Sequence, residues 1–81
     1  MRLTYDERVG AAYLRLREDA DDVGTVSSKP FRPPGSEMAD DYFVLDFDDA
    51  GRLVGIEFLM PEERLLPSVL ASADRSSRGS A

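Results

Sequence analysis

The sequence predicts a mainly β fold of the α+β class, in which two hairpins form a four- or five-stranded antiparallel sheet and one short helix follows near the C-terminus. Apolar and polar residues alternate with a period of two on both sides of a turn at residues 6–10. The same alternation flanks the acidic run 48–51, and after Pro61 the apolar spacing changes to that of a helix. A chain of 81 residues with this pattern is expected to form one domain.

The N-terminal segment carries the first hairpin. Leu3 and Tyr5 share one side of an extended segment, and beyond Gly10 the alternation resumes through residues 11–17. Residues 23–28 are rich in β-branched side chains, which predicts a third, weaker strand between the two hairpins.

The second hairpin has the strongest strand signal. If the acidic run 48–51 forms its loop, Leu45 lies opposite Val54 and Phe43 lies opposite Ile56, so that both pairs fall on one buried face. The other face then carries Tyr42, Val44, Asp46, Leu53, Gly55 and Glu57.

The remaining segments determine the predicted loop, the helix and the end of the domain. Residues 29–36 contain three prolines and a glycine, which predicts a Pro-rich loop. Pro61 ends the last strand, and an apolar stripe from Leu65 to Leu70 predicts a short helix that an internal proline kinks or divides. Residues 73–81 have no apolar anchor and are expected to be a disordered tail, which leaves residues 1–72 as the β domain.

The composition excludes several kinds of chemistry. The chain has no cysteine and no histidine, so disulfides, thiolate catalysis and imidazole ligands are ruled out. Its formal net charge of −6 disfavours nucleic acid and anionic membranes as partners. The longest apolar run, residues 53–60, is far shorter than the roughly 20 residues of a membrane helix. No signal sequence precedes the first strand, so a cytoplasmic protein is expected.

The acidic turn resembles a calcium-binding loop at first sight. Asp46, Asp48, Ala50, Gly51 and Glu57 occupy positions 1, 3, 5, 6 and 12 of an EF-hand pattern. Position 5 is an alanine, however, and the flanking residues alternate as in strands where an EF-hand needs helices. We interpret the run as a solvated acidic hairpin turn.

Asp46 and Glu57 are the two carboxylates that a catalytic pair would use. In the register above, Asp46 lies opposite Leu53, which places Glu57 four residues away, or about 13 Å along the strand. Carboxylate pairs in glycosidases lie about 5 to 9.5 Å apart. We therefore interpret both as solvent-facing charges that pair with Arg15 or Arg17. No catalytic, cofactor-binding or metal-binding residue is assigned, and no cofactor is expected.

The tyrosines are the remaining candidates for a ligand site. Aromatic residues at strand spacing more often form the core or cross-strand pairs than line a pocket. This interpretation covers Tyr5, Tyr13 and Tyr42.

Two stretches of the chain have a recognisable pattern. The first is residues 3–6 with 12–16, and the second is residues 45–59, in which the acidic turn precedes the Gly55-Ile-Glu57 triplet. They resemble the prokaryotic family called domain of unknown function 2283. The resemblance implies a small β-rich fold, no established activity and no catalytic residues. The Pro-rich loop and the residues after Met60 look like additions to a shorter family core.

These observations favour a non-enzymatic interaction or regulatory module. Too few large apolar side chains are present to offset the entropy of ordering the chain, so a homodimer is expected, burying either a sheet face or the Leu65–Leu70 stripe. The acidic charge also favours a basic protein partner. The alternative is a small-ligand or divalent-cation-binding domain. Its ligands would be Asp46, Asp48, Asp49 and Glu57.

Overall fold

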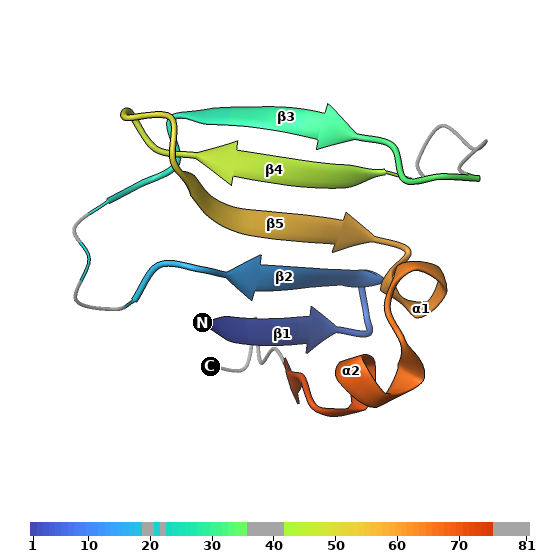
Figure 1. The fold of residues 1–81 in the computed structure, drawn as a ribbon. Coiled ribbons are helices and arrows are strands. Elements are labelled where there is room, and N and C mark those ends of the chain that lie inside the picture. The colour runs from blue at the N-terminus through green and yellow to red at the C-terminus, as the bar shows by residue number, and fades with distance from the viewer. Residues whose placement is uncertain (19–20, 22, 36–41, 76–81) are drawn as a thin grey trace.

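Six strands of the described residues form one mixed sheet in the order β3-β4-β5-β2-β1-β6 (Figure 1). The structure is a computed structural model, and it describes residues 1–18, 21, 23–35 and 42–75. The strands are β1 (Arg2–Asp6), β2 (Ala11–Arg15), β3 (Ser27–Phe31), β4 (Phe43–Phe47), β5 (Leu53–Leu59) and β6 (Asp74–Arg75), and the helices are α1 (Pro61–Arg64) and α2 (Pro67–Ala71). The mainly β class is confirmed, whereas the predicted four or five strands and single helix differ in detail.

The first hairpin forms as expected. β1 and β2 pair in antiparallel fashion, and the amide of Gly10 donates to the Asp6 carbonyl oxygen at 3.0 Å to close the turn. Gly10 has a φ of 68°, a left-handed conformation that suits glycine. The Asp6 carboxylate also accepts a hydrogen bond from the Arg8 amide at 3.0 Å. A short acidic side chain therefore organises this turn.

The predicted register of the second hairpin is wrong by two residues. Leu45 lies opposite Ile56 and not Val54, and Phe43 lies opposite Phe58. One residue of the shift comes from a longer turn, because β4 ends at Phe47 and β5 begins at Leu53. The other comes from a β-bulge at Val54. A shift of two keeps the side chains paired with Phe43 to Asp46 on their predicted faces. The prediction is wrong for Leu53, which lies opposite Phe47 beyond the bulge and not opposite Asp46.

The Pro-rich segment differs from its prediction as a loop. Its first residues, Lys29 to Phe31, belong to β3, which pairs with β4 at the edge of the sheet. An edge strand tolerates Pro30, because only one side of its backbone bonds to a neighbouring strand. The strand predicted at residues 23–28 begins only at Ser27. The last residue of the predicted loop, 36, lies outside the described residues.

The C-terminal segment contains two helices and a further strand. Pro67 starts α2, while Leu65 before it has an extended backbone that separates the two helices. β6 then pairs in parallel with β1, which makes the sheet mixed and orders the first part of the predicted tail. Residues 76–81 of that tail lie outside the described residues.

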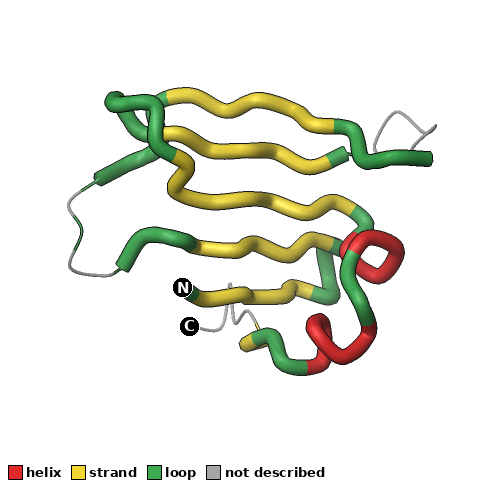
Figure 2. The backbone as a smooth tube through the Cα atoms, in the orientation of Figure 1, coloured by secondary structure: helices red, strands yellow, loops and turns green. Residues whose placement is uncertain are grey.

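The sheet has one apolar and one polar face, as the alternation predicts. The apolar face carries Leu3, Tyr5, Ala12, Leu14, Lys29, Phe31, Phe43, Leu45, Ile56 and Phe58. The polar face carries Arg2, Thr4, Asp6, Ala11, Tyr13, Arg15, Ser28, Pro30, Val44, Asp46, Gly55, Glu57 and Leu59. The core lies at one end of the apolar face, where Tyr5, Ala12 and Phe58 are buried beneath the helical segment. The described helices lie beside β1, β2 and β5 and leave β3 and β4 uncovered (Figure 2).

Candidate functional site

The acidic turn owes its shape to the Asp48 carboxylate. One oxygen accepts hydrogen bonds from the amides of Ala50 and Arg52, each at 2.9 Å. The other oxygen accepts one from the Arg52 guanidinium, also at 2.9 Å. The hydrogen bond from the Arg52 amide is the main cause of the lowered pKa of Asp48. Asp48 is only 4% exposed, so it serves the turn and is not presented to a ligand.

Asp46 lies in the middle of the polar face and holds three strands together. It accepts a hydrogen bond from the Tyr13 hydroxyl of β2 at 3.0 Å and one from the Ser28 hydroxyl of β3 at 2.7 Å. Burial of Tyr13, and next its hydrogen bond to the Asp46 carboxylate, raises the pKa of the phenol. Both carboxylate oxygens of Asp46 are thus engaged within the sheet.

Gly55 and Tyr13 pack as one unit on the polar face. The Tyr13 ring lies over Gly55, and a Cβ at position 55 would overlap its hydroxyl and outer ring atoms. A glycine in the middle of a strand leaves a gap that an aromatic side chain from the neighbouring strand can cover. Sequence reasoning missed this pair, because it depends on which residues of β2 and β5 lie side by side.

The two predicted carboxylate candidates lie closer together than the predicted 13 Å. Asp46 is opposite Gly55, and Glu57 is opposite Val44, so the carboxylates belong to diagonal neighbours on the polar face. The corrected register therefore removes the distance argument against a pair. The two carboxylates differ in their hydrogen bonds, since Asp46 already accepts one from the Tyr13 hydroxyl.

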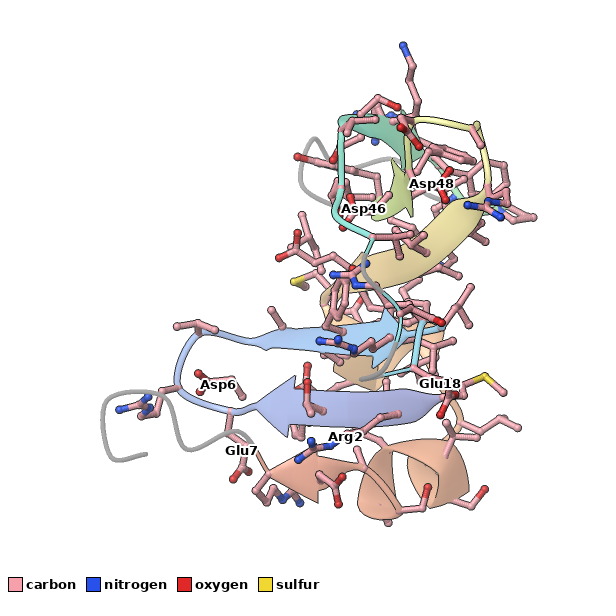
Figure 3. The ribbon with its side chains drawn as sticks, turned by 90° about the vertical axis from the view of Figure 1, so that its left-hand side faces the viewer. Arg2, Asp6, Glu7, Glu18, Asp46 and Asp48 are labelled. Carbon is pink, nitrogen blue, oxygen red and sulfur yellow. The ribbon has the colours of Figure 1, made fainter. Side chains whose placement is uncertain are left out.

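The acidic residues proposed as cation ligands do not converge. Figure 3 shows Asp46 and Asp48 on opposite sides of the β4 ribbon, because Asp46 lies within β4 and Asp48 belongs to the turn beyond its end. Within the described part of the chain, no group of three or more acidic side chains is placed to hold a metal ion. The geometry therefore offers no support for the cation-binding alternative.

A hollow of about 360 Å³ lies between β1 and the helices. The Tyr5 hydroxyl at its wall donates a hydrogen bond to the Glu62 carboxylate of α1. This bond is the main reason why the pKa of Tyr5 is raised and that of Glu62 is lowered. The Arg75 guanidinium lies 4.9 Å from the centre of the Tyr5 ring. These contacts attach the C-terminal segment to the sheet.

The three tyrosines do not share a pocket. Tyr5 belongs to the core, and Tyr13 lies on the polar face. The Arg32 guanidinium lies over the Tyr42 ring, with its central carbon 5.8 Å from the ring centre.

The candidate functional site is the part of the apolar face that the described helices leave uncovered, which we call the open apolar patch. It consists of Leu14, Phe31, Phe43, Leu45 and Ile56. Phe31 is 50% exposed, and the other four side chains are only partly buried. The Phe31 and Phe43 rings are 6.2 Å apart, and Phe43 meets the buried Phe58 edge to face at 4.9 Å. A row of aromatic rings therefore runs from the core to the exposed edge.

The extent of this sheet matches a known family model. The model described as protein of unknown function (DUF2283) covers residues 2–60, from the start of β1 to just beyond β5. The chain belongs to the DUF2283 family. No curated protein and no solved structure matches it. In the described part of this DUF2283 chain, no helix is long and apolar enough to cross a membrane.

The helices and β6 lie beyond the matched DUF2283 residues. Pro61 is fully buried, and Leu65 and Leu70 pack against the core cluster. Leu66 and Val69 of the same stripe are exposed instead. The C-terminal segment thus covers one end of the apolar face of the DUF2283 sheet from within the same chain, and leaves the open apolar patch at the other end.

Proposed function

We propose that this chain is a non-enzymatic protein-interaction module that binds its partner through the open apolar patch. The observation that carries the proposal is the aromatic row that runs from the buried Phe58 to the half-exposed Phe31, on a sheet face that the described helices cover only at one end. Contiguous exposed apolar surface bordered by polar residues is typical of protein–protein interfaces. Burying it in a complex would add hydrophobic stabilisation that the small core lacks.

The acidic side chains support the same proposal, because their hydrogen bonds within the fold give them structural roles. Asp46, Asp48 and Glu62 each accept hydrogen bonds that hold the sheet, the turn or the helical segment in place. Their roles are accounted for by the fold, whereas none of the described contacts accounts for the exposure of Phe31. A cytoplasmic location and a preference for a basic partner stay predictions.

The proposal is tested by photo-crosslinking from the patch in living cells. A photoreactive phenylalanine replaces Phe31 in one variant and Pro30 in the other. The two positions are neighbours in β3 and both are exposed, but they lie on opposite faces. We expect covalent protein adducts to form in clear excess from position 31. Equal yields from both positions would contradict a role for the apolar face.

A further inference from the structure

We infer that the partner on the open apolar patch is a second copy of this chain, packed face to face about a two-fold axis parallel to the strands. The inference rests on the proposed function, because it names the occupant of the same surface. Three features of the described residues support it: the position of the helices, the arrangement of the apolar rows and the placement of the acidic side chains.

The helical segment determines which two-fold axis is possible. Leu65 and Leu70 pack against Tyr5, Ala12 and Phe58 of β1, β2 and β5, and the helices lie at that end of these strands (Figure 1). Two sheets pack closely at about 10 Å. An axis between the sheets that runs across the strands would place each helical segment over the same strands, β1 and β2, of the partner and keep the sheets apart. An axis along the strands near β4 carries the partner's helices beyond the β3 edge, so the sheets can meet.

The apolar residues form two rows that this axis maps onto themselves. Phe31, Phe43 and Phe58 lie opposite one another across three strands and make an aromatic row. Leu45, Ile56 and Leu14 make the neighbouring aliphatic row. Rotation about an axis parallel to the strands keeps each residue's position along the strand. Aromatic residues therefore face aromatic residues, and Leu45 faces its own copy, as a self-complementary two-fold interface requires. Lys29, opposite Leu45 in β3, meets the partner's Ile56 with its aliphatic stem and keeps its ammonium group at the edge.

The acidic charge of the chain does not oppose this contact. The three acidic residues within strands β1 to β5 are Asp6, Asp46 and Glu57, and all three belong to the polar face. Figure 3 shows Asp6 and Asp46 directed to the same side of the sheet. On the apolar face the charged residue of these strands is Lys29. A second copy therefore brings no carboxylates of these strands together, while a basic partner would find none of them to pair with on this face.

The size of the patch predicts a dimer of moderate affinity. Four strands spaced about 4.8 Å apart, with five residues rising about 3.3 Å each, make a flat area of about 300 Å². Stable interfaces bury about 800 Å² per partner once side-chain surfaces are counted. The patch reaches this size only if the partner's helices also contact the β3 edge. We expect dissociation in the micromolar range.

Sedimentation equilibrium of the full chain tests the inference directly. Wild-type protein should reach twice the 9.0 kDa mass of the chain as its concentration rises through the micromolar range. Leu45→Lys should raise the dissociation constant at least tenfold, because it places a charge within the aliphatic row. Val44→Lys is the matched control, since the two residues are neighbours in β4, both partly buried and on opposite faces. It should leave the dimer unchanged.

Thiol crosslinking gives a second readout that does not depend on a charged substitution. The chain has no cysteine, so an introduced thiol is its only one. Leu45→Cys lies near the proposed axis and should be joined to its copy by a short bismaleimide, whereas Val44→Cys, on the outer face, should not. Equal crosslinking at both positions, or a dimer that Leu45→Lys leaves intact, would overturn the face-to-face arrangement.

The outcomes also separate this inference from the proposed function. A wild-type chain that stays monomeric at about 100 μM overturns the dimer. If position 31 then still crosslinks to other proteins in cells in excess of position 30, the open apolar patch binds a different partner and the proposed function survives. If it does not, both fail.

Discussion

Gly55 shows how a single missing side chain can be built into a sheet. The Tyr13 ring occupies the space that a Cβ would take, and its hydroxyl reaches Asp46. We expect Gly55→Ala to displace the ring, break that hydrogen bond and lower the free energy of unfolding by about 1–3 kcal/mol. Urea denaturation of the variant measures the loss.

A double-mutant cycle identifies the ring as the cause. With Tyr13→Ala in the background, the ring atoms that a Cβ at position 55 would overlap are gone, so Gly55→Ala should cost little. A loss of the same size in both backgrounds would mean that the glycine is needed for another reason.

Gly51 is required for its backbone conformation and not for space. Its φ is 78°, and an added Cβ would meet no atom within 4 Å. Gly51→Ala should therefore cost about 1 kcal/mol through left-handed strain alone. Gly24 is the control, because it is equally uncrowded and its φ lies outside the left-handed range. Gly24→Ala should leave the thermal midpoint unchanged or slightly raised, and an equal loss at both positions would rule out strain as the cause.

At the scale of elements, the helical segment depends on a few apolar contacts. In α2, Leu70 packs against the core cluster, whereas its neighbour Val69 is 39% exposed. We expect Leu70→Ala to lower the free energy of unfolding by about 1–3 kcal/mol, less than for a fully buried leucine. Val69→Ala should cost well under that. The two variants are compared by urea denaturation, and similar losses would show that the segment is not held by Leu70.

The sequence patterns predict the hairpins and the two faces, because alternation with period two is a local property. They do not predict register. The carboxylate of Asp48 lengthens the turn and Val54 bulges, and neither feature disturbs the alternation enough to be read in advance. β3 is hidden by Pro30, since a proline suggests a loop unless the strand is known to lie at an edge.

The sequence likewise predicts only those parts of the candidate site that depend on local patterns. Period-two patterning correctly assigns Phe43, Leu45 and Ile56 to an apolar face, and so points to the surface a partner would cover. The Tyr13–Gly55 contact and the two-residue strand β6 depend on residues brought together from distant parts of the chain. No local signal marks such contacts, so they become visible only with the register of the whole sheet.

At the scale of the whole molecule, stability should depend on pH at both ends of the range. Asp48 and Glu62 have lowered pKa values in the folded chain, so their ionised forms stabilise it. That contribution is present above the pKa values of the unfolded chain, near 4, and is lost as the pH falls through the lower folded values. Tyr5 and Tyr13 have raised pKa values, so their protonated forms stabilise the fold. Their contribution is present below about pH 10 and is lost as the pH rises through the folded values.

The urea midpoint should therefore be nearly constant between about pH 5 and 9 and fall on either side. Asp48→Asn should flatten the acid side, because the amide oxygen can still accept the turn hydrogen bonds but no longer titrates. Tyr13→Phe should flatten the alkaline side in the same way, since it removes the hydroxyl that Asp46 accepts. An acid side that stays equally steep in Asp48→Asn would show that other carboxylates govern it. In that case the tightly bonded turn would not set the acid stability of the molecule.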